Sequence, residues 1–327
     1  MKIAITGASG HVGINLCKAL IDLGHEINAL THKHDSRLKE TKVHCIKGDM
    51  LEKSSLHPLV LGCDIVIHLA AKISINGDPD GTGRLINVEG TRNILEVSQL
   101  AGVKKFIHFS SIHAFEQVSS TEVLDERNPL VGDEAFSYDR SKAEGERLVM
   151  EAAKQGFNAL VLCPTAIIGP VDYEPSLIGK AMLQLFNHEV PALVPGGYNW
   201  VDVRDIVQGC IAAIDKGRKG EKYLLSGEWK SLKEITTLIT RITGINTDRI
   251  EMPFWLARVG LPFITLYSKI TGTEPLYTSE SLHIIKFGTR KISNEKARKE
   301  LGYNPRELEI TLTDLFQWFK SNNIINY

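Results

Sequence analysis

Short apolar runs alternate with helical patterns along the first half of the chain. Between the runs, apolar residues recur at spacings of three and four, which predicts helices over about 12–23, 51–60, 84–100 and 138–153. Strands that alternate with helices form right-handed βαβ units, so the sequence predicts an α/β fold with a parallel sheet. The predicted strands lie within 2–6, 26–30, 42–48, 64–70, 104–110 and 157–164.

Several of these strands are apolar at consecutive positions. The clearest are 65–67 and 160–162, where every residue is Ile, Val or Leu. Such strands are buried on both faces, which is typical of a doubly wound sheet with helices on each side. Gly24 is expected just after the first helix and Pro164 at the end of its strand.

The pattern weakens after Pro164, where Pro and Gly become frequent. A helix within 201–217 is expected to return to the sheet, so we assign 1–169 plus about 201–224 to the larger domain. A smaller C-terminal lobe, from about 170–200 plus 225–327, is expected to bind the substrate. The apolar stretch 252–272 is interrupted by two prolines, an arginine and a lysine, so we predict a cover over an apolar pocket and no transmembrane segment. Peripheral membrane contact is the lesser alternative.

Composition narrows the class of partner. The 327 residues carry a net charge of −1 and no block of like charges, which argues against nucleic acid and favours a small-molecule substrate. The opening "MKIAITG" predicts a strand and no signal peptide, so a cytoplasmic location is expected. Five scattered cysteines without a C-x-x-C pair are expected to be reduced core residues: Cys17, Cys45, Cys63, Cys163 and Cys210.

The loop "TGASGHVG" follows the first strand and opens the first helix. Its glycines allow a tight turn, close approach of the backbone to a pyrophosphate, and close packing of helix on strand. This context predicts a Rossmann-type dinucleotide site, whereas a purely steric turn is the weaker alternative. The residues expected around the pyrophosphate are Gly7, Ser9, Gly10, His11, Val12 and Gly13.

The end of the second strand decides between the two dinucleotides. Thr31 stands where an acidic residue would accept from a free ribose 2′-hydroxyl, and His32, Lys33 and Arg37 follow it. These cations favour NADP, and nearby Asp35 leaves NAD possible.

Asp49, after the third strand, has two open interpretations. Its carboxylate would accept from the adenine amino group, or it would cap a helix that starts near Leu51. Both roles are compatible.

The stretch "SYDRSK" places Tyr138 and Lys142 on one face of a predicted helix. A nearby positive charge lowers the pKa of a phenol, so Lys142 and an oxidised nicotinamide are expected to make Tyr138 a usable acid or base. The start of this helix is ambiguous: Ser137 is one candidate cap, and Ser141 with Glu144 forms a rival capping box.

Taken in order, these motifs resemble the extended short-chain dehydrogenase/reductase superfamily along the whole chain. "HLAA" at 68–71, "NVEGT" at 87–91, "FSSIHAF" at 109–115 and "CPTAIIGP" at 163–170 carry the resemblance together with the glycine loop, Asp49 and the Tyr138/Lys142 pair. The tail over 291–319 is similar to dihydroflavonol-4-reductase-like and 3β-hydroxysteroid-dehydrogenase-like members. Ala114, Phe115 and Glu116 depart from the usual "VYG".

The resemblance implies a hydride-transfer site. Ser111, Tyr138 and Lys142 would be catalytic, and a homodimer is expected. The implied activity is NADP-dependent reduction of a carbonyl, or oxidation of a secondary alcohol, on a mainly apolar small molecule. Beyond the glycine loop and His32, Lys33 and Arg37, the cofactor residues that it implies are Asp49, Met50, Leu69, Ala70, Ala71, Asn87, Ser110, Tyr138, Lys142, Pro164, Thr165 and Ile167.

Two other functions stay open. An NAD-dependent sugar-nucleotide epimerase or dehydratase would need arginines on a diphosphate, for which Arg204 and Arg290 are candidates. A non-catalytic dinucleotide sensor would use the same fold but would have little need for Tyr138 and Lys142.

Overall fold

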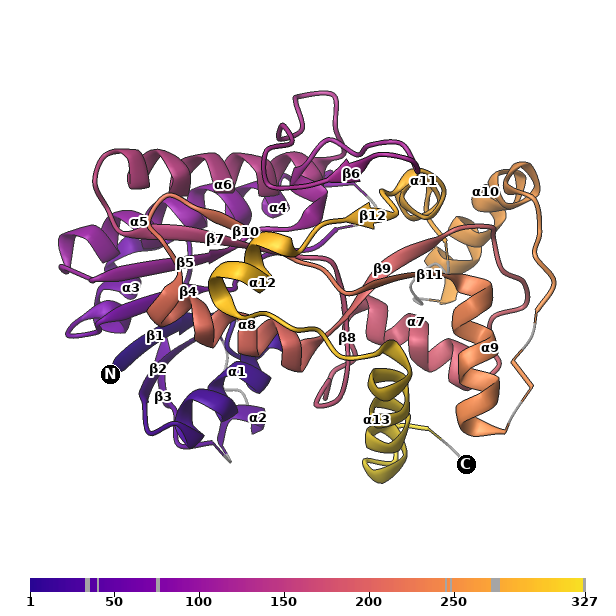
Figure 1. Ribbon diagram of the computed structural model, residues 1–327, viewed down its shortest axis with the longest axis horizontal. Coiled ribbons are helices and arrows are strands. Elements are labelled where there is room, and N and C mark those ends of the chain that lie inside the picture. Colours follow the sequence, from indigo (N-terminus) through magenta and orange to yellow (C-terminus); the bar gives the residue numbers. More distant parts are fainter. Residues whose placement is uncertain are drawn as a thin grey trace.

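The computed structural model describes residues 1–32, 36–39, 41–74, 77–244, 246–247, 249–271 and 277–325, with the side chains of 36, 39 and 263–271 left out. Two parts lie next to each other (Figure 1). The larger part is built on a parallel sheet, and the smaller part carries a short sheet surrounded by helices from the second half of the chain.

The larger part contains a seven-stranded sheet in the order β10-β7-β5-β4-β1-β2-β3. Every neighbouring pair in this sheet is parallel, as the apolar runs predicted. The strand order reverses between β1 and β4, which is the switch point where α/β sheets bind ligands at their carboxyl ends. The strands are β1 (Lys2–Thr6), β2 (Glu26–Thr31), β3 (His44–Lys47), β4 (Ile65–His68), β5 (Lys105–Phe109), β7 (Ala159–Pro164) and β10 (Lys222–Leu225).

Helices cover both faces of this sheet, so the doubly wound Rossmann-type fold is confirmed. One hydrophobic cluster joins the sheet to α1 (His11–Asp22), α8 (Val203–Lys216) and α12 (Glu295–Leu301). The opposite cluster joins it to α3 (Lys53–Val60), α5 (Thr91–Leu100) and α6 (Ser137–Lys154). The short helix α2 (Ser36–Lys39) follows β2.

The helix expected over 84–100 is in fact three segments. A turn of α-helix, α4 (Thr82–Arg84), leads into a π-helical segment, η1 (Leu85–Gly90), and then into α5. Helix α6 packs against η1 so closely that a Cβ at Gly145 would lie 2.9 Å from the Asn87 carbonyl oxygen. Gly145 therefore allows this close packing, at the usual cost of a glycine inside a helix.

The smaller part contains a three-stranded sheet in the order β11-β9-β8. β9 runs parallel to β8 and antiparallel to β11. The lobe boundaries stay a prediction. The pairing of β8 with β9 makes residues 166–168 a strand of the smaller sheet, although the predicted boundary assigned them to the larger domain. The elements are β8 (Ala166–Ile168), α7 (Leu177–Phe186), β9 (Gly197–Asp202), β11 (Glu228–Ser231), α9 (Leu232–Thr243), α10 (Phe254–Thr271), α11 (Ser279–Phe287) and α13 (Leu308–Ser321), and a two-stranded ladder joins β6 (Val123–Leu124) to β12 (Lys291–Ile292).

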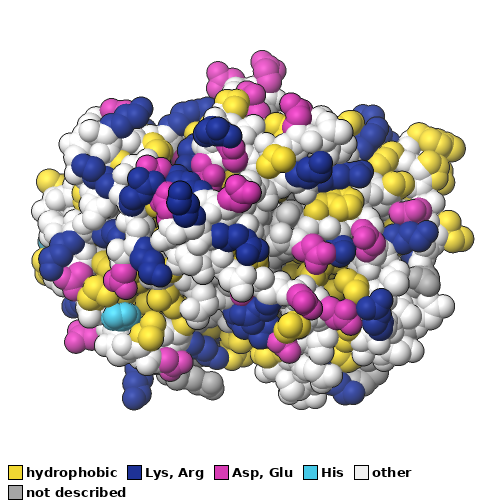
Figure 2. Space-filling model, viewed as in Figure 1, with side chains coloured by type: hydrophobic (Ala, Val, Ile, Leu, Met, Phe, Trp, Pro, Cys, Tyr) yellow, Lys and Arg dark blue, Asp and Glu magenta, His cyan; other side chains and the backbone are white. Residues whose placement is uncertain are grey.

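Two details refine the sequence analysis. Four of the cysteines are buried and free, but Cys45 is exposed because β3 is the edge strand of the sheet, so the expectation of a core residue is wrong there. Among the described residues, no helix is both long and apolar enough to cross a membrane. Helix α10 contains Pro262, and its exposed side chains contribute to the hydrophobic surface at that edge of the smaller part (Figure 2).

Candidate active site

The glycine loop between β1 and α1 is shaped by contacts that leave no room for side chains. Gly7 has a φ of +71°, and a Cβ there would lie 2.7 Å from the Ala70 nitrogen. A Cβ at Gly13 would lie 2.2 Å from the Gly7 carbonyl oxygen. Gly10 is the N-cap of α1 and provides no side-chain cap, so backbone N–H groups at this helix start remain suited to an anion.

The neighbouring residues of this loop contact the smaller part. His11 Nε2 donates to the Pro170 carbonyl oxygen at 3.1 Å, and Asn15 Nδ2 donates to the same oxygen at 3.3 Å. Ser9 and Val12 lie in the same loop and first helical turn. The loop geometry therefore fits a pyrophosphate, with the connection after β8 held against it.

The residues expected at the adenosine ribose lie after β2. Thr31 is buried at the end of that strand, while the side chain of His32 is exposed and lies 4.0 Å from the Asp49 carboxylate. Arg37 Nη1 pairs with Glu174 Oε2 at 3.0 Å. Lys33 lies outside the described residues. The sequence did not indicate Glu174, because nothing in its local pattern shows which cation it meets.

Asp49 forms a local turn. Its Oδ1 accepts from the Leu51 nitrogen at 2.8 Å, and its own nitrogen donates to Ser55 Oγ. Helix α3 begins at Lys53 with Glu52 as its N-cap, so the prediction that Asp49 caps this helix is wrong. The adenine role stays a prediction. Met50, next to it, is buried against Gly90.

Asn87 lies inside the π-helical segment η1. Its Oδ1 accepts from the Lys72 nitrogen at 2.8 Å, and its Nδ2 donates to Ser141 Oγ at 2.9 Å. The side chain thus ties the loop after β4, which includes Leu69, Ala70 and Ala71, to helix α6.

The residues after β5 and β7 border the same region. Ser110 Oγ is buried and, among the described residues, has no hydrogen-bond partner. Pro164 ends β7, and Thr165 Oγ1 donates to Asn199 Oδ1 at 3.0 Å. Ile167 belongs to β8 and is partly exposed. The orphaned hydroxyl fits a site that a ligand completes.

Helix α6 begins earlier than either predicted cap would place its first residue. Ser137 is its first residue and Phe136 is the N-cap, without a side-chain hydrogen bond. Both capping predictions are therefore wrong, because Ser141 Oγ donates to the Tyr138 carbonyl at 2.7 Å and Glu144 pairs with Arg84. Tyr138 and Lys142 consequently share the first turns of one helix, as predicted.

Ser111, Tyr138 and Lys142 come together between β5 and α6. Ser111 Oγ caps a short 3₁₀ turn, η2 (Ile112–Ala114), by accepting from the His113 nitrogen at 3.1 Å. The Ser111 hydroxyl also acts on the Tyr138 phenol and lowers its pKa, against the larger effect of burial. Lys142 is buried, and its Nζ donates to the Phe109 carbonyl at 2.6 Å.

Burial dominates the electrostatics of this trio. It raises the pKa of Tyr138, and the Asp139 charge raises it further, against the smaller effect of Ser111. Burial also lowers the pKa of Lys142 to about 8. The net direction at Tyr138 is thus opposite to the one we expected from Lys142. A phenol that keeps its proton is suited to donate it.

Sequence reasoning missed Asp139 as a neighbour of this site. Burial raises its pKa to about 7, with Glu280 of α11 adding to the effect. His113 Nδ1 lies 3.6 Å from Asp139 Oδ1, and burial lowers the pKa of His113 to about 4. The His113 ring is 6.3 Å from that of Tyr138. Only the tertiary fold brings η2 and α11 to this helix start.

Comparison with known proteins agrees with this geometry. The model of the NAD dependent epimerase/dehydratase family matches residues 3–226, which span the glycine loop, the trio and the whole parallel sheet. The chain belongs to this family. It is an NAD(P)-dependent oxidoreductase of the extended short-chain dehydrogenase/reductase type, as the sequence motifs implied.

Several relatives match over nearly the whole length of both proteins. It is 30% identical to sterol demethylase protein B of Methylococcus capsulatus, over 99% of this chain and 100% of that protein. It is also 30% identical to a putative dihydroflavonol 4-reductase of Synechocystis, over 98% of this chain and 95% of that protein. The crystal structure of gox2253 superposes with a TM-score of 0.85, at 30% identity, covering 100% of this chain and 99% of that one.

Proposed function

We propose that this chain reduces a carbonyl group, or oxidises the matching secondary alcohol, on a mainly apolar small molecule, with NADP as its cofactor. The observation that carries the proposal is that the Ser111 hydroxyl acts on the phenol of Tyr138, with Lys142 buried one helical turn further along α6. These are the groups that carbonyl reduction needs around a substrate oxygen.

A bound nicotinamide supplies the hydride for this reaction. In the reductive direction the Tyr138 hydroxyl donates its proton to the substrate oxygen, while the Ser111 hydroxyl hydrogen-bonds the same oxygen. Because burial keeps Tyr138 protonated, the proton is present when the substrate arrives. The charge of Lys142 stabilises the phenolate that forms, and the reverse sequence applies to alcohol oxidation.

The apolar substrate class is supported by the smaller part of the molecule. Hydrophobic side chains of α10 remain at the surface, among them Trp255, Leu256 and Val259. The names of the two relatives refer to a sterol and to a dihydroflavonol. An apolar ligand would gain from the burial of such surface.

NADP is proposed because cations follow β2 and Thr31 stands in place of an acid. Arg37 and His32 both lie near the end of that strand, and Thr31 offers no negative charge to a 2′-phosphate. NAD is the alternative cofactor. The predicted homodimer also stays a prediction.

The sugar-nucleotide alternative has less support from the two arginines that it needs. Arg204 is bound by Asp202 and by Asp314, each at 2.7 Å. Arg290 stacks over the Trp229 ring at 4.7 Å. Both are engaged within the protein, and one of them lies between two carboxylates that would repel a diphosphate.

The test is the variant Tyr138→Phe, assayed by NADPH oxidation with a panel of steroidal, aromatic and alkyl ketones. We expect kcat to fall at least about 1000-fold while the Kd for NADPH changes little, since the phenol proton is lost and the ring remains. The matched control is Tyr303→Phe, which removes a hydroxyl that donates to the Ser226 carbonyl. Full turnover by Tyr138→Phe would refute the site, and binding of UDP-glucose in place of ketones would favour the alternative.

A further inference from the structure

A fully buried carboxylate lies one helical turn beyond Lys142. Glu146 is 0% exposed and follows Lys142 by four residues on α6, so Tyr138, Lys142 and Glu146 share one face of the helix. Its Oε1 lies 3.0 Å from Lys222 Nζ on β10. Its Oε2 accepts from Cys163 Sγ at 3.8 Å. Glu146 is fully buried, whereas the side chain of Lys222 is 18% exposed. Removing a carboxylate from water costs more than one such pair returns, so its presence calls for another role.

The groups that face Lys142 from the neighbouring strands are mostly neutral. Burial and the charge of Lys142 lower the pKa of His68 on β4 to about 3 and hold that of His108 on β5 well below its usual range. Burial raises the pKa of the Cys163 thiol on β7 well above its usual range. Two groups oppose burial and raise the pKa of Lys142: Cys163 first, and then Glu146. Because burial holds the Cys163 thiol protonated, the carboxylate of Glu146 is the negative charge that remains on this side of Lys142.

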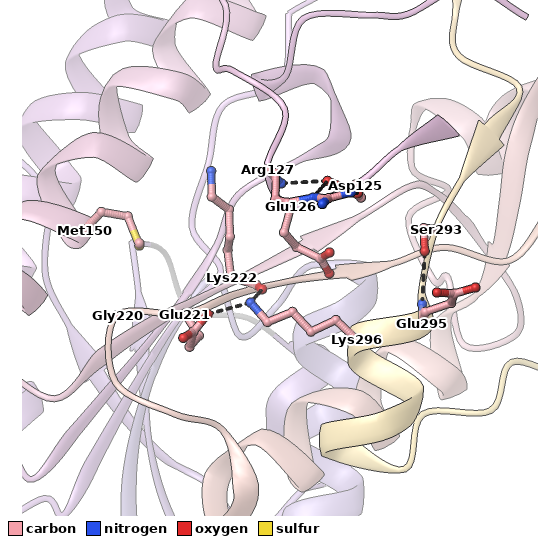
Figure 3. Close-up of a pocket in the computed structure, with 10 residues that line it drawn as sticks. All are labelled: Asp125, Glu126, Arg127, Met150, Gly220, Glu221, Lys222, Ser293, Glu295 and Lys296. Carbon is pink, nitrogen blue, oxygen red and sulfur yellow. Dashed lines mark hydrogen bonds and ion pairs between the residues drawn. The ribbon is translucent and has the colours of Figure 1, made fainter. Parts of the chain in front are cut away.

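Lys222 takes part in two environments. Its ammonium group pairs with Glu146 and lies 4.7 Å from the centre of the Phe115 ring. Its side chain also lines a cavity of about 400 Å³ together with Glu126 and Met150 (Figure 3). Met150 is one turn beyond Glu146 on α6, so the row of side chains that starts at Tyr138 ends at this cavity. Lys222, which pairs with Glu146, thus lies near the end of the row that is farthest from Tyr138.

We propose that Glu146 is a positioning residue for the reaction, and that its charge, divided between Lys142 and Lys222, sets how much of Lys142 is protonated during turnover. This inference rests on the proposed function, because it assigns Glu146 through the role of Lys142. Glu146 touches neither substrate nor cofactor and acts through the lysine alone. Lys222 limits the effect, since it holds the same carboxylate.

Substitutions of Glu146 and Lys222 should shift the titration midpoint of Lys142 in opposite directions. Glu146→Gln removes the negative charge and leaves Lys222 unpaired, so the titration midpoint of Lys142 should move down by about one pH unit. Lys222→Gln removes the competing cation, so the midpoint should move up. The double variant removes both charges and should return toward the wild type. It also avoids an uncompensated buried charge, so it remains informative if a single variant folds poorly.

The experiment follows Lys142 by NMR of protein with ¹³C-labelled lysine side chains, with Lys142→Arg assigning the signal. In parallel, kcat of the holoenzyme is measured from about pH 6 to pH 9. For Glu146→Gln we expect kcat near the wild-type value at pH 6 and roughly fivefold lower at pH 8, since protonation at low pH restores the lysine charge. A merely structural role would lower kcat evenly across this range.

The control variant is Asp64→Asn, which removes an exposed ion pair to Lys104 and should move neither curve. The inference is overturned if Glu146→Gln leaves both the Lys142 titration and the pH profile unchanged. It is also overturned if Lys222→Gln shifts them in the same direction. Failure of the proposed function looks different: the NMR titrations would still shift in opposite directions while Tyr138→Phe keeps its turnover.

Discussion

The glycine loop of the larger part is tightly packed, whereas the smaller part exposes large apolar side chains. In the larger part, a Cβ at Gly13 or Gly7 would lie only 2.2 or 2.7 Å from backbone atoms. The shape of the glycine loop is therefore fixed by its neighbours in the same fold. In the smaller part, Ile250, Trp255 and Val259 are 83%, 66% and 59% exposed. The first surface is complementary to one kind of ligand, whereas the second is available to many apolar ones. If the smaller part binds the substrate, as proposed, this difference explains how one reaction site can serve different substrates.

The largest effect is expected where the larger part is tightest. In Gly13→Ala the new methyl group would press on the Gly7 carbonyl, which must move away from its place in the loop. We expect the Kd for NADPH to rise by about 100-fold or more, and the free energy of unfolding to fall by roughly 1–3 kcal/mol. Calorimetric titration and urea denaturation measure the two quantities. Gly132→Ala is the control, since its Cβ would meet no atom within 4 Å, and equal losses in both variants would contradict the steric argument.

The next effect is expected at the contact between the two parts. Asp139 of α6 has a pKa raised to about 7, with burial and Glu280 of α11 as causes, against about 3.8 in the unfolded chain. The folded state therefore holds this proton more strongly. Its contribution to stability is complete below pH 3.8 and is lost as the pH rises through about 7.

Asp139→Asn cannot ionise and should remove this pH dependence. The gain in unfolding free energy over the wild type should grow between pH 5 and pH 8, up to an upper limit of about 4 kcal/mol. Urea denaturation at both pH values measures it. Asp133→Asn changes an exposed carboxylate and serves as the control. A gain that is constant with pH would show that the two parts are not coupled through this carboxyl group.

A smaller effect is expected where the smaller part reaches the first βαβ unit. Glu174 pairs with Arg37, and its side chain is 79% exposed, so it competes with any phosphate for the same cation. Glu174→Gln should improve NADP binding relative to NAD by up to about fivefold, because exposed ion pairs contribute at most ~1 kcal/mol. Fluorescence titration with each cofactor measures the ratio. Glu189→Gln is a distant control, and an equal change for NAD and NADP would argue against a 2′-phosphate at Arg37.

The smallest effect on stability is expected at α10. Because Trp255 is largely exposed, Trp255→Ser should change the free energy of unfolding by less than about 0.5 kcal/mol. If α10 covers the substrate, KM for an apolar ketone should rise several-fold while kcat stays constant. Steady-state kinetics with one long-chain and one short-chain ketone measures this effect. An unchanged KM for both would place the substrate away from this surface.

The sequence predicted those features that local chemistry determines. The period of apolar residues identified the parallel strands, and the spacing of Tyr138 and Lys142 placed both on one helix face. Capping failed as a guide because Ser141 and Asn87 bond each other across two helices. The pKa of Tyr138 could not be predicted from its lysine neighbour, since burial arises from elements far apart in the chain.

The histidines beneath the trio have a consequence for experiment. His68 is held between Thr6 and Thr91, and His108 stacks 5.2 Å from it without a hydrogen-bond partner in the part of the chain described. Burial keeps the pKa values of both histidines below the physiological range. The two rings therefore stay neutral and do not titrate between pH 5 and 8. An inflection near pH 7 in a rate profile is therefore not assigned to His68 or His108, and Asp139, whose pKa burial raises to about 7, is the group to test first.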